Sequence, residues 1–410
     1  MAIPARAFAP ANTPANATAR TTRFSFTRAF AIAFALLACA QASAQALKPI
    51  PPPLQSAESP PQVEAKSWVL ADFDSGWVIA SSNADLRIEP ASLTKLMTGY
   101  LAFDALAKGE TALDTQVLIS EKAWRTGGSR MFVQVDTRVS VDDLLRGLII
   151  QSGNDAAVAL AEHLGGSEAH FAQRMNRMAQ RLGMINTQFA NASGLPHPQQ
   201  YSTALDMSAL ARALIRDFPE RFRLYSEREF TYNGITQPNR NKLLWRDPSV
   251  DGLKTGYTEK AGYCLIGTAR RDGMRLIAAV TGAQDARARA DQVQSLLRHG
   301  FFAYAQMTAY QSGEEIAELP LWMGQQPRAR IGIEHDLRIL HPKGAHDKLS
   351  GALELPDSLD APLQAGQAVG RLVVKFDGEA VRDTELQVAQ DYAEGAWWSQ
   401  WLDSIKRLIF

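Results

Sequence analysis

The chain is poor in cysteine, with only two among its 410 residues. Cys39 lies in an N-terminal segment that we expect to be removed, so Cys264 cannot form an internal disulfide in the mature chain.

Neither sign of charge is in excess, because 43 basic residues balance 43 acidic ones. No nucleic acid is therefore indicated as a partner. At 46% hydrophobic and 21% charged residues, the composition is that of a globular protein of one large domain or two to three ordinary ones.

The apolar run near the N-terminus, Ala29–Ala40, is too short to span a bilayer. Arginines precede it, and the small residues Ala42-Ser43-Ala44 follow it. This pattern is typical of a secretory signal peptide, which we predict over residues 1–44. Leu36–Cys39 loosely resembles a lipoprotein cleavage site, which we weight lower because the small-residue site lies just downstream.

Histidine is also scarce, with seven in the chain, and no histidine pattern indicates a catalytic or metal site. His335, His341 and His346 cluster in a loop-rich stretch, where we expect them to be solvated rather than to ligate a metal. No Gly-x-Ser-x-Gly motif accompanies them, so a Ser-His-Asp hydrolase is not favoured. We predict no metal and no cofactor.

The remaining pattern predicts an early β-hairpin, a cluster of helices, a late β-hairpin and a closing helix. The expected elements are residues 67–73, 77–80, 92–101, 140–150, 156–164, 167–182, 203–218, 262–269, 274–280 and 288–302. This order favours an antiparallel sheet packed with helices, class α+β, over residues 66–306. A proline-rich stretch over residues 45–65 is expected to be an extended linker before it.

After residue 306 the helical periodicity disappears, and short β-like pieces alternate with turns. We predict a small all-β domain over residues 307–391. Residues 392–410 predict an amphipathic helix whose apolar side includes three tryptophans, and this composition favours a position in a membrane interface. The alternative is that this helix docks on its own domain.

Ser92 and Lys95 provide the first chemical signal. Pro90 precedes them, and apolar residues at helical spacing follow, so both should lie on the first turn of a buried helix. Residues three apart share a face, so the lysine amine can reach the serine hydroxyl. A serine needs an adjacent base to act as a nucleophile, and burial, the helix dipole or a second cation would lower the pKa of the lysine enough for that role.

Two further clusters complete a motif. Ser152-Gly153-Asn154 falls in a break between predicted helices, and Lys254-Thr255-Gly256 opens the late sheet region. In this order with Ser92-x-x-Lys95, they are the mark of penicillin-binding proteins and serine β-lactamases. The chain resembles the low-molecular-weight D-alanyl-D-alanine carboxypeptidases in these motifs and in the segments around them, Glu89–Thr98, Gln151–Ala156, Gln237–Asn241, Val250–Gly256 and Ala261–Tyr263.

The resemblance implies that Ser92 attacks the carbonyl between two D-alanines while Lys95 accepts its proton. It places Ser152 in the proton path to the leaving group. Asn154 would bind the substrate amide or hold Lys95, and Lys254 would be a second cation that keeps Lys95 neutral.

The resemblance also assigns substrate contacts. Thr255, in the Lys-Thr-Gly sequence that Gly256 completes, would bind the terminal carboxylate, near Arg240 and Arg289. The backbone N–H groups of Ser92 and Tyr257 would form the oxyanion hole. Family members often have His or Thr where this chain has Tyr257, which affects the expected deacylation rate and pH profile.

The resemblance implies a location in the periplasm. The implied partners are peptidoglycan pentapeptides as substrate, β-lactams as covalent inhibitors, and the surface of the inner membrane through the C-terminal helix. One alternative is a β-lactamase, although no Glu-x-x-x-Asn element follows Ser152-Gly153-Asn154 and the C-terminal region is foreign to class A enzymes. An endopeptidase of the same fold would usually lack the β domain. A catalytically idle β-lactam-binding scaffold is disfavoured by the intact triple of motifs.

Overall fold

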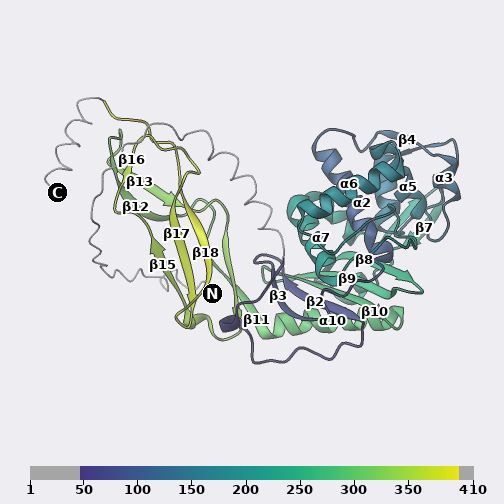
Figure 1. The fold of residues 1–410 in the computed structure, drawn as a ribbon, viewed down its shortest axis with the longest axis horizontal. Helices are drawn as coiled ribbons and strands as arrows, with labels where there is room; N and C mark the ends of the chain where they lie inside the picture. Colours follow the sequence, from purple (N-terminus) through teal and green to yellow (C-terminus); the bar gives the residue numbers. More distant parts are fainter. Residues whose placement is uncertain (1–46, 397–410) are drawn as a thin grey trace. The chain divides into compact units, whose positions relative to one another are not determined.

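The structure, a computed structural model, describes residues 47–396. The described chain divides into two compact units (Figure 1). One unit comprises residues 47–50 and 58–302 and is called the α+β unit. The other comprises residues 51–57 and 303–396 and is called the β unit. The predicted signal peptide lies outside the described residues.

The α+β unit is built on a six-stranded sheet in the order β1-β3-β2-β10-β9-β8. Its strands are β1 (Lys48–Pro49), β2 (Ser67–Asp72), β3 (Trp77–Ser82), β8 (Val250–Thr258), β9 (Gly262–Arg271) and β10 (Met274–Ala283). The early hairpin β2–β3 and the late hairpin β9–β10 are both as predicted. An antiparallel pairing of β2 with β10 joins them, so strands far apart in sequence form one sheet.

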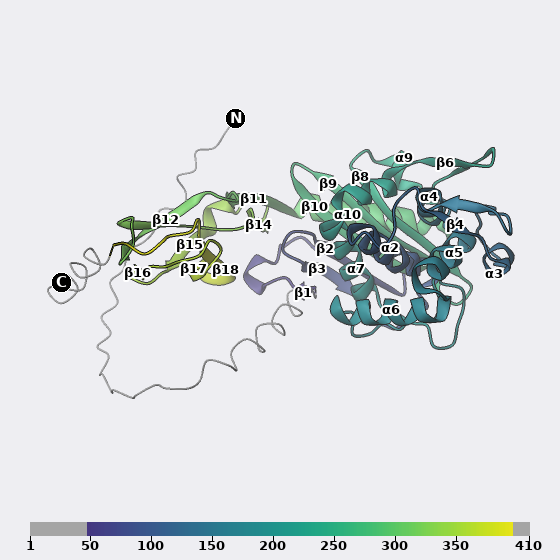
Figure 2. The ribbon, with the colours of Figure 1, turned by 90° about the horizontal axis from the view of Figure 1, so that it is seen from above.

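Helices cover both faces of this sheet (Figures 1 and 2). The cluster on one face includes α2 (Lys95–Ala107), α4 (Val141–Ile149), α5 (Asn154–Gly165), α6 (Glu168–Arg181) and α7 (Ala204–Asp217). The long helix α10 (Ala286–Ala303) covers the other face, with Val293 against Gly267 of β9. Because α2 lies inside the cluster, most of its residues are buried.

Shorter elements complete the α+β unit. They are η3 (Ala91–Thr94), β4 (Gln116–Leu118), α3 (Glu121–Arg125), β5 (Arg138–Ser140), α8 (Pro219–Phe222), η4 (Arg223–Ser226), β6 (Glu229–Tyr232), β7 (Ile235–Pro238) and α9 (Leu243–Arg246). Side-chain caps begin several helices: Ser140 accepts from the Asp143 N–H at the start of α4, and Thr203 accepts from the Asp206 N–H at the start of α7.

The first part of the proline-rich segment, residues 48–54, is not the extended linker that its composition predicts. Lys48–Pro49 forms β1, parallel to β3, and Pro52–Leu54 forms the short helix η2. The apolar side chains between the prolines explain the difference, because Ile50 and Leu54 are buried. Proline at the start of η2 also suits a helical turn, since its missing N–H would have no partner there.

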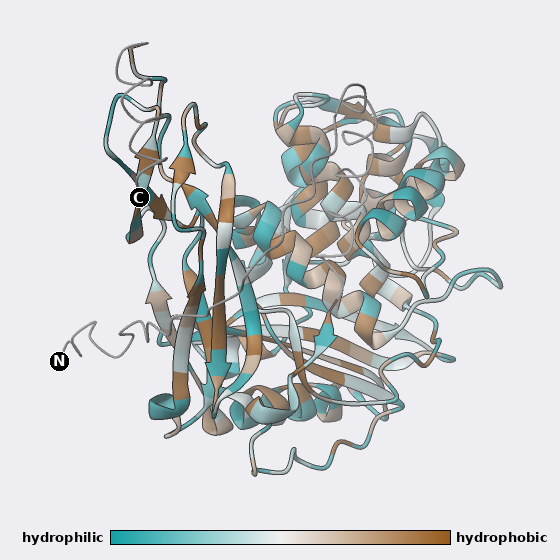
Figure 3. Ribbon diagram, turned by 60° about the vertical axis from the view of Figure 1, so that its left-hand side comes forward, coloured by the Kyte–Doolittle hydropathy of each residue, from teal (hydrophilic) through white to brown (hydrophobic). Residues whose placement is uncertain are grey.

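The β unit contains two sheets. Its strands are β11 (Tyr304–Tyr310), β12 (Glu315–Trp322), β13 (Arg328–Gly332), β14 (Leu337–Pro342), β15 (Leu349–Glu354), β16 (Leu359–Asp360), β17 (Ala368–Phe376) and β18 (Glu379–Val388), with the short helix η5 (His346–Lys348). Hydrophilic and hydrophobic residues succeed one another along these strands (Figure 3). The all-β prediction is confirmed, but β11 begins at Tyr304, before the predicted start at residue 307.

The predicted terminal helix starts too early. Tyr392 pairs with Leu363 and Glu394 with Gly324, so residues 392–395 extend the β unit instead of forming a helix. These pairings use backbone N–H and carbonyl groups that would otherwise form the hydrogen bonds within a helix. The rest of the predicted helix, residues 397–410, lies outside the described residues. Within residues 47–396, no helix has the length and apolarity needed to cross a membrane.

Candidate active site

Ser92 and Lys95 lie where the sheet meets the helical cluster. Ser92 belongs to the short helix η3, which leads directly into α2 at Lys95. The Lys95 Nζ atom is 3.0 Å from the Ser92 Oγ atom. The expected pairing across one turn is therefore present, although the turn that holds Ser92 is a 3-10 turn rather than the first turn of α2.

The Lys95 amine is fully buried and has three oxygen neighbours. Besides Ser92 Oγ, it contacts Asn154 Oδ1 at 2.6 Å and the backbone carbonyl of Ser193. Burial lowers the pKa of Lys95 to about 7, while the nearby Asp155 carboxylate raises it. A neutral amine can donate to Asn154 and Ser193 and direct its lone pair at the Ser92 hydroxyl. The site thus matches the needs of a general base.

Ser152 and Asn154 reach the same place from the break between α4 and α5. Ser152 has a positive φ of 62°, a conformation that is uncommon for a residue with a Cβ atom and that is often found at functional sites. Asn154 spans two partners, because its Nδ2 atom donates to the Gly127 carbonyl at 2.7 Å while its Oδ1 atom accepts from Lys95. Asn154 therefore links Lys95 to the loop before α4.

Lys254 approaches from β8, on the opposite side of the site. Its Nζ atom donates to Ser152 Oγ at 2.8 Å and to the Thr255 carbonyl at 3.0 Å. Burial lowers the pKa of Lys254 well below its usual value, and the positive charges of Lys95, Arg289 and Arg240 lower it further. For Lys95, in contrast, burial is the main cause of the low pKa. Lys254 is not among the causes of the low pKa of Lys95, so the expectation that Lys254 keeps Lys95 neutral stays a prediction.

Gly256 allows β8 to lie against η3. A Cβ atom at this position would be 3.2 Å from Ala91 Cβ and 3.3 Å from the Leu93 nitrogen, which is closer than ordinary contact. The backbone of the next residue, Tyr257, is thereby brought beside the Ser92 segment, as an oxyanion hole made of their N–H groups requires. Tyr257 is 51% exposed, and its ring packs at a tilt against that of Tyr263, with ring centroids 4.4 Å apart.

Thr255, Arg240 and Arg289 share a cavity of about 430 Å³ that opens beside the Lys-Thr-Gly strand. Arg240 lies in the segment after β7, and Arg289 lies on α10 and donates to the Gly256 carbonyl at 3.0 Å. The two guanidinium groups and the threonine hydroxyl provide donors and positive charge that suit a carboxylate. Ser92 does not line this cavity, so the cavity extends to one side of the nucleophile.

Sequence reasoning missed several groups that organise the site. The Gly127 and Ser193 carbonyls were not expected, because any residue provides a carbonyl and no side-chain pattern marks it. Asp155 was also missed, although it directly follows Asn154. Its buried carboxylate accepts the N–H groups of Met131 and Phe132, and so holds the loop that carries Gly127. A buried acid at a helix start is a signal that could have indicated this role.

The arrangement provides an activated serine, a buried lysine base, a second serine hydroxyl bonded to a lysine, and a basic cavity. These groups can form and hydrolyse an ester on Ser92. Within the part of the chain that the structure describes, no cluster of His, Cys, Asp and Glu could hold a metal ion.

Two family profiles match the chain. The profile described as D-alanyl-D-alanine carboxypeptidase matches residues 54–285. The profile described as the C-terminal domain of penicillin-binding protein 5 matches residues 304–394. The matched ranges thus include nine of the ten site residues and nearly all of the β unit. The tenth site residue, Arg289, lies four residues beyond the first range.

Curated relatives and solved structures agree with these profiles. The chain is 41% identical to D-alanyl-D-alanine carboxypeptidase DacA of Escherichia coli K12, over 85% of this chain and 89% of the relative. It is 39% identical to DacC of the same strain, over 86% and 90% of the two chains. The structure of penicillin binding protein 5 from Haemophilus influenzae matches with a TM-score of 0.76 and 41% identity, over 82% of this chain and 100% of that chain.

Proposed function

The chain belongs to the D-alanyl-D-alanine carboxypeptidase family, and we propose that its site performs the family reaction through an acyl-enzyme on Ser92. The protein is a serine-type enzyme that removes the terminal D-alanine from peptidoglycan pentapeptides and is inhibited by penicillin. The observation that supports the proposed residue roles best is the Lys95 amine, which is buried, has a pKa near 7 and lies 3.0 Å from Ser92 Oγ.

In the acylation step, the Ser92 oxygen attacks the carbonyl carbon of the penultimate D-alanine, and Lys95 accepts the hydroxyl proton. The negative charge that develops on the carbonyl oxygen is stabilised by the N–H groups of Ser92 and Tyr257. The C–N bond then breaks, and a proton delivered through Ser152 converts the leaving nitrogen to the amine of D-alanine. The hydrogen bond from Lys254 orients the Ser152 hydroxyl for this transfer.

In the deacylation step, a water molecule attacks the same carbonyl carbon. Lys95 accepts a proton from the water, and the bond to Ser92 Oγ breaks as the oxygen is protonated again. The oxyanion donors serve both steps, since both pass through a tetrahedral intermediate. With a β-lactam, the amide that breaks is part of the ring, so its leaving nitrogen stays attached to the acyl-enzyme and can hinder the approach of water.

Substrate specificity would come from the basic cavity. The carboxylate of the terminal D-alanine would accept hydrogen bonds from Thr255 and lie within the positive field of Arg240 and Arg289. Both arginines also lower the pKa of Lys254. A bound carboxylate would offset this repulsion and favour the charged form of Lys254, so substrate binding and the protonation of the site are coupled.

We predict that the purified protein shortens a muropeptide ending in D-alanyl-D-alanine by one residue. Mass spectrometry should show loss of one alanine and an equal amount of free D-alanine, and penicillin should block both. A Ser92→Ala preparation serves as the control for contaminating peptidases. Cleavage of cross-linked dimers without trimming would identify an endopeptidase, and rapid turnover of penicillin would identify a β-lactamase.

Export and membrane attachment are a further part of the proposal. The signal-like segment over residues 1–44 supports a periplasmic location. The C-terminal stretch supports attachment to the outer face of the inner membrane, because its apolar residues fall on one side at helical spacing, namely Trp397, Trp398, Trp401, Leu402, Ile405, Leu408 and Ile409. Lys406 and Arg407 on the other side can contact anionic headgroups, and tryptophan favours the interface.

Deleting residues 397–410 is therefore expected to release the protein from membranes while leaving penicillin binding intact. Each buried apolar side chain contributes roughly 1–2 kcal/mol to membrane binding, so loss of the whole set should abolish it. Residues 392–395 stay in the truncated protein because they pair within the β unit. Co-sedimentation with anionic liposomes measures the effect. Full-length protein that stays in the supernatant would contradict attachment through this segment.

A further inference from the structure

The backbone carbonyl that accepts from Lys95 belongs to the loop Asn191–Leu195, whose consecutive peptide groups each have a fixed partner. The Ser193 carbonyl accepts from Lys95, and the N–H on the same peptide group, that of Gly194, donates to Asn191 Oδ1 at 2.7 Å. The preceding carbonyl, that of Ala192, accepts from Thr98 Oγ1 at 2.7 Å. Thr98 lies one turn after Lys95 on α2, so α2 contacts this loop twice.

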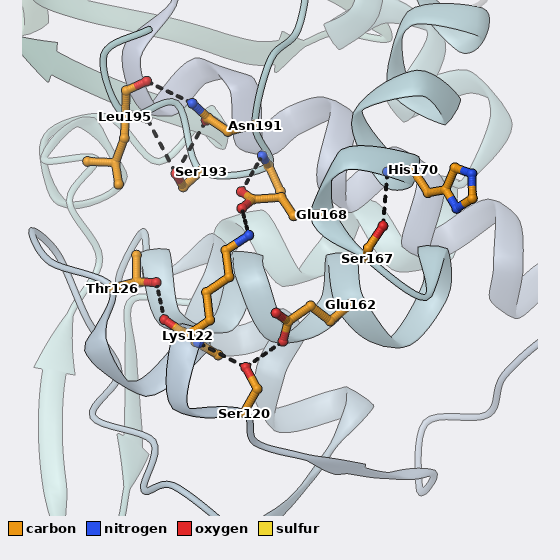
Figure 4. A network of polar contacts seen from close by, with 12 residues as sticks. Ser120, Lys122, Thr126, Glu162, Ser167, Glu168, His170, Asn191, Ser193 and Leu195 are labelled. Carbon is orange, nitrogen blue, oxygen red and sulfur yellow. Dashed lines mark hydrogen bonds and ion pairs between the residues drawn. The ribbon is translucent and has the colours of Figure 1, made fainter.

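The peptide group between Asn191 and Ala192 is held by Glu168, at the start of α6. Its Oε1 atom accepts the Ala192 N–H at 3.1 Å, and its Oε2 atom forms an ion pair with Lys122 of α3 at 2.6 Å (Figure 4). The Glu168 side chain is only 13% exposed, whereas that of Lys122 is 57% exposed. Ala192 and Ser193 are buried, so their N–H and carbonyl groups depend on protein partners.

This loop also has little freedom to shift toward η3. Gly194 has a φ of 86°, and a Cβ atom there would lie 1.8 Å from the Ala91 carbonyl oxygen, next to the nucleophile. The loop is thus in contact with the Ser92 segment on one side and held by Glu168 on the other. A change in the Glu168 contact would move the Ser193 carbonyl relative to the Lys95 amine.

We propose that Glu168 is a positioning residue for the reaction, which holds the Ala192 N–H so that the Ser193 carbonyl orients the Lys95 amine toward Ser92. This role rests on the proposed function, since it assumes that Lys95 is the base. Glu168 touches no reacting atom. It acts through two successive peptide groups of the loop, and it connects the site to α3 through Lys122.

The same region offers a matched control. Glu162 of α5 lines the same cavity of about 590 Å³ as Glu168, and it accepts from Ser120 Oγ at 2.6 Å (Figure 4). Both glutamates therefore accept a hydrogen bond near α3. Only Glu168 is bonded to the loop that carries Ser193. Replacing Glu162 removes a comparable acceptor without touching this loop.

The experiment compares Glu168→Ala, Glu168→Gln, Lys122→Met and Glu162→Ala in the full-length protein. The measured quantity is the acylation rate constant with fluorescent penicillin over a range of pH, per active enzyme. Glu168→Ala is expected to lower the plateau rate about tenfold or more, because small displacements of catalytic groups have effects of this size. Glu168→Gln keeps an acceptor for the Ala192 N–H, so its acylation rate should be close to that of the wild type. Lys122→Met and Glu162→Ala leave this acceptor unchanged and should also have the wild-type rate.

The pH profile separates positioning from a general loss of structure. Without the Ser193 carbonyl in place, the charged form of Lys95 loses an acceptor, so the acid limb of the profile should move to lower pH. Partial unfolding would lower the rate equally at every pH. An unshifted limb, or a Glu168→Ala rate within twofold of wild type, overturns the proposal. Failure of the proposed function would be distinct, since the wild type itself would then not be acylated at Ser92.

If Glu168→Ala does not fold, Thr98→Val tests the same loop from the other side. Valine has nearly the shape of threonine but cannot donate to the Ala192 carbonyl. The plateau rate should fall and the acid limb should shift in the same direction as for Glu168→Ala. A folded Thr98→Val variant with the wild-type profile would show that the position of this loop does not control Lys95, and would overturn the proposal.

Discussion

Replacing Ser92 with alanine is expected to abolish covalent labelling by penicillin and to lower D-alanine release by at least about a thousandfold. The reason is that the acyl-enzyme forms on the Ser92 oxygen. Among the described residues, Ser92 provides the one hydroxyl that is hydrogen-bonded to the Lys95 amine, at 3.0 Å. Ser152 is the nearest rival by motif, but its hydroxyl is bonded to Lys254. Labelling with fluorescent penicillin, followed by gel separation and peptide mapping, measures the effect.

The Ser92→Ala variant should remain folded, because Ser92 is only half-buried and the change removes a single oxygen. Its thermal unfolding midpoint therefore serves as the control. If the adduct in the wild type maps to a different residue, or if the variant is labelled at the wild-type rate, Ser92 is not the nucleophile.

Replacing Lys95 with arginine keeps the positive charge but should reduce acylation by a similar factor. Arginine stays protonated at every pH at which the protein is folded, since its pKa lies above about 12. It cannot accept the Ser92 proton, so acylation should fall by at least about a thousandfold. Arginine is also larger than the buried lysine that it replaces and could destabilise the fold, so the unfolding midpoint of the variant serves as the control. Acylation within about tenfold of wild type, or ~1.4 kcal/mol of barrier, would mean that another group accepts the proton.

The pH dependence of the wild type tests the same role without a substitution. Burial lowers the pKa of Lys95 to about 7, and only the neutral amine can act as a base. The neutral fraction is therefore high above pH 7 and falls below it, so the acylation rate should decrease about tenfold per pH unit on the acid side. Stopped-flow acylation from acid to alkaline pH gives the profile. A rate that is constant across neutral pH would contradict a titrating lysine base.

Most of the local structure could be predicted from the sequence because its signals are short-range. The turn at Asp74–Gly76, the cap at Ser140 and the helical spacing after Lys95 each depend on residues within one or two turns. The Ser92–Lys95 pair was predictable for the same reason, since residues three apart on a helical turn meet wherever the turn is placed. The wrong predictions at residues 48–49 and 392–395 fall where pairing with distant parts of the chain overrides composition.

The sequence by itself determined which residue types carry the chemistry, because Ser92-x-x-Lys95, Ser152-x-Asn154 and Lys254-Thr255-Gly256 are readable as motifs. Only the tertiary structure decided what the Lys95 amine contacts. Asn154 and the Ser193 carbonyl reach it from elements far along the chain, and Glu168 holds the Ser193 loop from α6. Backbone carbonyls carry no residue identity, and burial is a property of the whole packed unit. The burial that lowers the pKa of Lys95 and the partners that orient its amine toward Ser92 therefore become defined only when α2, α5, α6 and β8 are assembled.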